Sequence, residues 1–268
     1  YHIQWQNAMS WVRTNTPETA VFAHWWDYGY WLQSIGKRAT VLDGGNAIVY
    51  WDYLMGRYVL TEPDESKRLE FLYSHNATHL LIDSTEIGKY TAFSSIGSDK
   101  NYDRFSWIST FIMDEKQTQE TGSKIVYVYA GGTSVDEDII WKENGSDIFI
   151  PRGAILGAVL LNTQNETLLQ PEAIFLNKNI QYRIPLRYIY YKGELKDFKS
   201  GLEAGIFIYP SVANSGGQAQ VNDKGAVLYL SRRTINTPVA RLYLFNEKSN
   251  YFKLVHSEED IIVQQLKQ

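Results

Sequence analysis

The stretch AVFAHWWDYGYWLQSIG, residues 20–36, joins a short apolar run to a second, amphipathic segment. Residues 20–25 are typical of a buried strand, because their apolar side chains follow one another without a helical period. Residues 27–36 predict a short helix that ends at Gly36, a residue type suited to helix C-termini. A strand followed directly by a helix is the repeating unit of an α/β layer.

The same alternation continues on both sides of this stretch. Residues 3–12 carry a helical stripe, and residues 38–45 predict a strand that ends in a Gly-Gly turn. A helix over residues 46–60 has Asn46 as a plausible N-cap. A further helix over 63–76 begins with Pro and two acids, and a buried strand follows over 77–83. We therefore expect a mixed α/β core.

After residue 121 the chain consists mainly of β-type runs separated by Gly, Asn, Asp and Pro turns. Their spacing predicts an antiparallel sandwich or a partial barrel. We expect an α/β core formed by residues 1–120 together with 232–268, and a β-rich insertion over 121–231.

The tail of the chain returns to the core. Residues 239–246 and 251–257 predict a strand pair joined by a polar hairpin, and residues 257–268 fit either a strand or a short helix.

Composition excludes several classes of site. The chain of 268 residues has a formal net charge of −4 and no cysteine, which excludes disulfides, thiol nucleophiles and Cys-type zinc sites. Its mild acidity and the absence of Lys/Arg runs argue against a nucleic-acid partner. Its longest apolar run, residues 153–161, is about half of the ~18 residues that span a bilayer. The chain begins at Tyr1 within an amphipathic pattern, so we expect a fragment or a processed product.

Trp25, Trp26 and Asp27 have complementary hydrogen-bonding chemistry. Two indole N–H groups only donate, and an ionised carboxylate only accepts, whereas a hydroxyl does both. The three side chains together therefore match a single alcohol. A buried socket of this kind disfavours a ligand without the hydroxyl by ~1–3 kcal/mol for each group left unpaired. The alternative interpretation is two core indoles beside a helix-capping acid.

The pentapeptide Trp25 to Gly29, WWDYG, resembles the signature of the catalytic subunit of oligosaccharyltransferases, and all five residues match. The flanking residues 9–46 also resemble that family. The size, the lack of cysteine and the lack of a membrane region are most similar to the C-terminal globular domain of the archaeal AglB type.

This resemblance implies transfer of a lipid-linked oligosaccharide, on a dolichol-phosphate type carrier, to the Asn of Asn-X-Ser/Thr in an acceptor polypeptide. It implies that Trp25, Trp26 and Asp27 bind the Ser/Thr hydroxyl, with Tyr28 and Gly29 as support. The catalytic acids and a divalent metal, Mn²⁺ or Mg²⁺, are expected in an N-terminal transmembrane region. The domain alone is thus expected to be inactive, to hold no cofactor, and to lie on the extracytoplasmic face of the membrane.

A second family motif, Asp-X-X-Lys-X-X-X-Met/Ile, aligns with Asp52, Met55 and Val59. The spacing matches and places the three side chains on one helix face, but Met replaces Lys and Val replaces Met/Ile. Met55 and Val59 are expected to touch the Thr methyl group, and burial of one methyl at ~0.8 kcal/mol predicts about a fourfold preference for Thr over Ser. The alternative is an ordinary apolar stripe, with Gly56 marking a kink.

The chain also contains sequons of its own, at Asn76, Asn144 and Asn165, which are possible glycosylation sites. His75 and His79 are four residues apart, but no third ligand stands near them, and we expect no metal site there.

The competing function is a carbohydrate-binding module that uses exposed aromatic side chains. The tyrosine-rich stretch over residues 181–193 is its candidate surface. The alternative is a sheet that packs these rings on one face and keeps their hydroxyls solvated.

Overall fold

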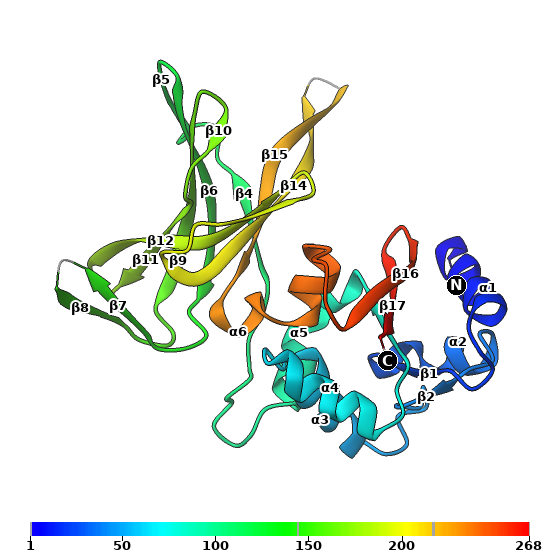
Figure 1. The fold of residues 1–268 in the computed structure, drawn as a ribbon. Helices are drawn as coiled ribbons and strands as arrows, with labels where there is room; N and C mark the ends of the chain where they lie inside the picture. The colour runs from blue at the N-terminus through cyan, green and yellow to red at the C-terminus, as the bar shows by residue number, and fades with distance from the viewer. Residues whose placement is uncertain (1, 144, 216–217, 268) are drawn as a thin grey trace. The chain divides into compact units, whose positions relative to one another are not determined.

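The computed structural model describes residues 2–143, 145–215 and 218–267 (Figure 1). The chain forms two compact units, Tyr1–Trp107 with Asn236–Gln268, and Ile108–Ile235. The first mixes helices with a sheet and the second is almost entirely β-structure, so the predicted fold class is confirmed. Within the described residues, no helix has both the length and the apolar character that a membrane span requires.

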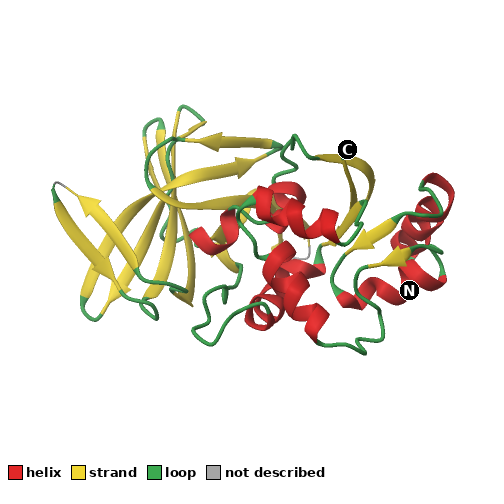
Figure 2. Ribbon diagram, turned by 60° about the horizontal axis from the view of Figure 1, so that its bottom comes forward, coloured by secondary structure: helices red, strands yellow, loops and turns green. Residues whose placement is uncertain are grey.

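The first unit contains a five-stranded sheet with helices packed around it (Figure 2). Its elements are α1 (Ile3–Asn15), β1 (Val21–Ala23), the 3₁₀ turn η1 (Trp26–Tyr28), α2 (Gly29–Ser34), β2 (Ala39–Thr40), α3 (Tyr50–Met55), the π-helical turn η2 (Gly56–Leu60), α4 (Glu65–Ser74), β3 (His79–Asp83), α5 (Thr85–Ile96), the π-helical turn η3 (Val239–Leu244), β16 (Phe252–Glu258) and β17 (Ile261–Leu266).

The sheet has the strand order β16-β17-β3-β1-β2. Strand β1 runs parallel to β2 and to β3, whereas β17 is antiparallel to β3. Every residue of β3 is buried, as expected for a strand near the centre of a covered sheet. The carboxyl ends of β1, β2 and β3 therefore meet at one edge.

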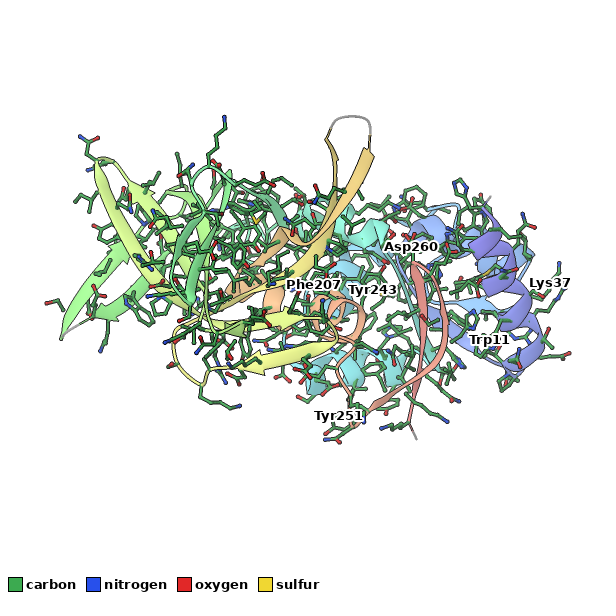
Figure 3. The ribbon with its side chains drawn as sticks, turned by 90° about the horizontal axis from the view of Figure 1, so that it is seen from above. Trp11, Lys37, Phe207, Tyr243, Tyr251 and Asp260 are labelled. Carbon is green, nitrogen blue, oxygen red and sulfur yellow. The ribbon has the colours of Figure 1, made fainter. Side chains whose placement is uncertain are left out.

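Helix α1 confirms the predicted helical stripe. Ala8, Met9 and Val12 are fully buried along one side of it. Trp11, which Figure 3 labels on this helix, stacks on His256 of β16; the ring centroids are 4.5 Å apart. Helix α1 thus covers the β16–β17 hairpin.

Two local predictions are wrong. Asn46 is not a helix N-cap: it has a φ of 48°, and α3 begins only at Tyr50. Residues 239–246 do not form a strand, because Pro238 at φ −58° starts the π-helical turn η3, in which Val239, Ala240, Leu242 and Leu244 are buried. The strand partner of β16 is instead β17, the last element of the chain.

The second unit carries the remaining elements. They are β4 (Ser109–Met113), β5 (Gln119–Thr121), β6 (Lys124–Ser134), β7 (Ile139–Glu143), β8 (Ser146–Ile150), β9 (Ile155–Gln164), β10 (Thr167–Leu168), β11 (Glu172–Asn177), β12 (Ile180–Tyr191), β13 (Glu194–Asp197), β14 (Leu202–Ser215), β15 (Gln218–Leu230) and α6 (Arg232–Ile235).

Seven of these strands close into a barrel, in the order β4-β6-β9-β11-β12-β14-β15 and back to β4. The pairing of β6 with β9 completes the ring, and closure removes the exposed edges of the sheet. The expected barrel-like architecture is confirmed, although β12 and β14 pair in parallel and not antiparallel. Strand β4 pairs with β15 and β6, so this unit begins at Ile108, whereas the sequence analysis began it at residue 121.

Tyr129 is an unusual member of the barrel core. It is fully buried and its hydroxyl has no hydrogen-bond partner in the described structure. Burial raises the pKa of this phenol above its ordinary value, so the hydroxyl stays neutral.

Replacing Tyr129 with Phe should leave the barrel as stable or make it more stable. The change removes an unsatisfied polar group whose burial costs about 1–3 kcal/mol, and it keeps the ring in place. Urea unfolding of both proteins measures the difference. A loss of more than about 1 kcal/mol, the usual worth of a protein hydrogen bond, would show that the hydroxyl has a stabilising partner.

Candidate functional site

Three loops meet at the carboxyl edge of the parallel strands in the first unit. Residues 25–28 follow β1, residues 43–46 follow β2, and residues 83–86 end β3 and begin α5. This edge is where open α/β sheets usually place their ligand sites, because the loops there are free to vary while the strands fix their positions.

Gly29 and Gly44 bring the first two loops into direct backbone contact. A Cβ atom on Gly29 would lie 2.3 Å from the backbone nitrogen of Gly44, and one on Gly44 would lie 2.2 Å from that of Tyr30. No side chain fits at such distances. Gly29, expected to support the motif, therefore has a steric reason to be glycine.

Trp25 and Trp26 follow β1 directly. Trp25 is 3% exposed and its ring lies 5.7 Å from that of Phe93 on α5, whereas Trp26 is half-buried. Neither indole N–H has a hydrogen-bond partner within the part of the chain that the structure describes. Both donors thus lack an internal partner there, and the half-buried Trp26 is the more exposed of the two.

Asp27 is half-buried and forms an ion pair. Its Oδ2 atom lies 2.6 Å from the Nζ atom of Lys89 on α5. Its Oδ1 atom has no side-chain partner among the described residues. One oxygen of the carboxylate is thus held and the other remains free to accept.

Tyr28 anchors the motif to the neighbouring loop. Its hydroxyl lies 2.5 Å from Oγ1 of Thr85 and donates to Oδ1 of Asp83 at 3.3 Å. Its ring stacks on that of Trp5, with centroids 4.8 Å apart. Burial, followed by the nearby Glu86 carboxyl, raises the pKa of this phenol above its ordinary value. Tyr28 therefore has a structural role in fixing the turn that carries Asp27.

Two buried titratable side chains lie beside the motif. His24 is fully buried; its Nδ1 lies 2.5 Å from the Trp25 carbonyl oxygen, and burial lowers its pKa to about 4. Glu86 is also fully buried; one oxygen accepts from the backbone N–H of Asp83, and the other has no partner among the residues that the structure describes. Burial raises the pKa of Glu86 well above its ordinary value.

The second motif lies on α3 and η2. Asp52 is 2% exposed, and burial is the main cause of its raised pKa, which the Asn46 side chain opposes. Met55 and Val59 are both 0% exposed, so neither side chain can touch a Thr methyl group in this conformation. That expectation is corrected: both residues pack in the core.

Gly56 marks the change from α3 to the π-helical turn. A Cβ atom there would lie 2.6 Å from the carbonyl oxygen of Phe93. The glycine therefore allows a close approach of α3–η2 to α5, in agreement with the distortion predicted at this position.

Sequence reasoning missed Lys89, Glu86 and Thr85, because it did not predict α5. The run Ser84-Thr85-Glu86 directly after a buried strand is a helix-start signal that could have indicated them.

None of the three sequons belongs to the loops that form this edge. Asn76 is exposed, but the hydroxyl of Thr78, the third residue of its sequon, accepts from the backbone N–H of Val21 at 3.0 Å. The sequon hydroxyl is therefore engaged within the fold. Asn165 lies in the two-residue turn between β9 and β10 at φ 47°, and Asn144 lies outside the described residues.

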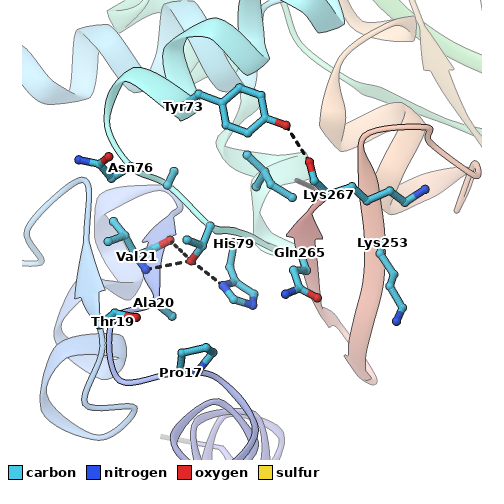
Figure 4. A pocket seen from close by; sticks show the side chains of 13 residues that line it. Pro17, Thr19, Ala20, Val21, Tyr73, Asn76, His79, Lys253, Gln265 and Lys267 are labelled. Atoms are coloured by element: carbon cyan, nitrogen blue, oxygen red, sulfur yellow. Dashed lines mark hydrogen bonds between the residues drawn. The ribbon is translucent and has the colours of Figure 1, made fainter.

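A pocket of about 660 Å³ opens at the opposite ends of the same strands (Figure 4). Val21 and His79, the first residues of β1 and β3, line it together with Lys253 and Gln265. His79 stacks on Phe22, and burial lowers its pKa to about 4. Within residues 2–143, 145–215 and 218–267, no group of three His, Asp or Glu side chains is arranged to hold a metal ion. His75 lies against Phe71 instead.

No protein-family model matches the chain. Over 95 residues it is 33% identical to dolichyl-phosphooligosaccharide-protein glycotransferase 1 of Pyrococcus furiosus, which covers 35% of this chain and 10% of the relative. Over 259 residues it is 20% identical to dolichyl-phosphooligosaccharide-protein glycotransferase 2 of Pyrococcus horikoshii, which covers 96% of this chain and 27% of the relative.

The chain is similar to oligosaccharyltransferases. The resemblance identified from WWDYG and its flanks is confirmed at the level of the whole chain. Among solved structures, the C-terminal domain of C. jejuni PglB aligns with a TM-score of 0.51 and 11% identity, over 98% of this chain and 100% of that one. This likeness shows a shared fold.

Gly29→Ala should destabilise the first unit by roughly 1–3 kcal/mol or more, because the added methyl meets the Gly44 backbone. Gly88→Ala on α5 is the matched control. It has nothing within 4 Å of the added carbon and should stabilise the helix by about 1 kcal/mol. Thermal unfolding followed by circular dichroism compares the two, and equal effects would contradict the close crossing.

Glu86→Gln should change how stability depends on pH. The pKa of Glu86 is raised in the folded state, so folding becomes less favourable as pH rises above its unfolded value of about 4.5. Removing this group should make the variant gain stability relative to the parent between pH 5 and 8, with no gain at pH 4. Urea titrations across this range measure the difference, and a relative loss at pH 8 would contradict the assignment.

Proposed function

We propose that this chain is the acceptor-recognition domain of an oligosaccharyltransferase and reads the Ser/Thr of Asn-X-Ser/Thr. The observation that carries the proposal concerns Trp25, Trp26 and Asp27: among the described residues, two indole donors without partners precede a carboxylate that keeps one oxygen free. The similarity to dolichyl-phosphooligosaccharide-protein glycotransferases supports the same function.

The recognition step follows from hydrogen-bond complementarity. The acceptor hydroxyl donates its proton to Oδ1 of Asp27, and its lone pairs accept from the indole N–H groups of Trp25 and Trp26. A third residue without a hydroxyl leaves these groups unpaired, and each unpaired group costs ~1–3 kcal/mol. The site thereby selects Ser or Thr over residues of similar size.

The chemistry of transfer is assigned to the rest of the enzyme. The matched stretches span 10% and 27% of the two Pyrococcus relatives, so most of such a protein lies outside this chain. We place the catalytic acids, the lipid-linked oligosaccharide of the dolichol-phosphate type, and the Mn²⁺ or Mg²⁺ ion in an N-terminal transmembrane region. This domain then lies on the extracytoplasmic face and positions the acceptor polypeptide, and no residue set described here fits the metal.

The carbohydrate-binding alternative has weaker support. On β12, Tyr188 is 6% exposed, and the ring of Tyr190 stacks on Phe207 with centroids 4.9 Å apart. The Tyr191 ring faces the ammonium groups of Lys192 and Lys224. These rings pack against other side chains of the protein, as expected for a sheet that packs its tyrosine rings on one face.

Asp27→Ala in the full-length enzyme should nearly abolish transfer to a sequon peptide at fixed metal and lipid donor. Loss of a hydrogen bond to a charged group, at about 1.5–3 kcal/mol, predicts a decrease of roughly 10- to 150-fold in kcat/KM for the peptide. Trp26→Phe keeps an aromatic side chain, removes the indole N–H donor and should give a smaller loss.

The control is Asp138→Ala, since Asp138 lies in the second unit and is assigned no role in the site. It should transfer at the parent rate. Undiminished transfer by Asp27→Ala would reject the proposed function.

A further inference from the structure

Lys89 contacts the motif in two ways. Its ammonium lies 2.6 Å from Oδ2 of Asp27 and 5.0 Å from the centre of the Tyr28 ring. The side chains of Lys89 and Asp27 are 35% and 28% exposed, so both groups are partly withdrawn from water. An ion pair combined with a cation–π contact fixes the ammonium better than either interaction alone.

The surrounding elements fix where Lys89 stands. Helix α5 begins at Thr85, directly after β3, and the Thr85 hydroxyl lies 2.5 Å from that of Tyr28. Lys89 is one helical turn further along α5. The parallel pairing of β1 with β3, together with the short hydrogen bond between Tyr28 and Thr85, therefore connects the motif to the helix that carries Lys89.

Other carboxyl groups lie near Asp27. Its charge contributes to the raised pKa of Asp52 on α3 and of Glu86 on α5, while Asp43 also acts on Asp52 and Asp83 on Glu86. Two further titratable side chains lie beside Asp27, His24 and Tyr28, and burial keeps both uncharged near neutral pH. Lys89 supplies the positive charge, and it favours ionisation of Glu86.

We propose that Lys89 is the positioning residue of the hydroxyl-binding site. Its ammonium holds Oδ2 of Asp27 and leaves Oδ1 to accept the proton of the acceptor hydroxyl. This inference rests on the proposed function. The position where the family motif has a lysine is occupied here by the buried Met55, so the ammonium beside Asp27 comes from a different helix.

The test compares Lys89→Met with Lys89→Arg in the full-length enzyme, measuring peptide binding by fluorescence anisotropy from pH 5 to 8 and peptide KM and kcat at pH 7. Lys67→Met, an exposed lysine on α4, is the control and should bind as the parent does. Loss of the ammonium should weaken binding of an Asn-Ala-Thr peptide about tenfold, the effect expected for one partly buried charge-assisted contact.

Lys89→Met should also move the pH below which peptide affinity is lost to a higher value, because a carboxylate without its cation binds a proton more readily. Lys89→Arg keeps the charge and should retain the parent pH profile. The loss should appear in the KM for the peptide and not in the KM for the lipid-linked donor. A merely structural role would lower the thermal midpoint without moving the pH profile.

Two outcomes separate this inference from the function on which it rests. If Asp27→Ala removes peptide binding but Lys89→Met keeps the parent affinity and pH profile, the positioning role is wrong and the hydroxyl site stands. If Asp27→Ala also binds the peptide normally, both are wrong.

Discussion

The contact between the backbones at Gly29 and Gly44 is the constraint on which the site depends. It allows the loop after β1 and the loop after β2 to lie closer than any side chain would permit. The parallel pairing of β1 with β3 brings the start of α5 to the same edge. A turn held from both sides in this way presents Trp26 and Asp27 in one defined arrangement, and preorganised groups bind a ligand at a lower entropic cost.

Acidic side chains predominate over basic ones at this edge of the sheet. Glu86 and Asp52 are buried with raised pKa values, and Asp27 contributes to both shifts. The ion pair of Asp27 with Lys89 offsets part of this repulsion. Buried acidic side chains with raised pKa values are characteristic of functional sites. Such residues are found there although they lower the stability of the fold.

The sequence predicted the α/β core, the barrel-like unit and the position of WWDYG after a strand, because those features follow from local periodicity and from rare residue types. The sequence did not predict α5, because its glycine and its mixture of polar and apolar residues give a weak helical pattern. Lys89 and Glu86 on this helix were therefore missed. Residues 239–246 were predicted to form a strand because, over so short a run, their apolar residues fit both the helical and the strand period. The burial of Met55 and Val59 depends on contacts between α3–η2 and α5, which spacing along the chain does not reveal.

The central claim is that Asp27 with Trp25 and Trp26 reads a side-chain alcohol. The most direct measurement is a double cycle in the full-length enzyme, with parent and Asp27→Asn each binding otherwise identical peptides that carry Asn-Ala-Thr or Asn-Ala-Val. Thr and Val have nearly the same shape and differ in the hydroxyl. The account predicts that the parent prefers Thr by tenfold or more, about 1.4 kcal/mol, and that Asp27→Asn loses most of this preference. An unchanged preference for Thr in Asp27→Asn would contradict it.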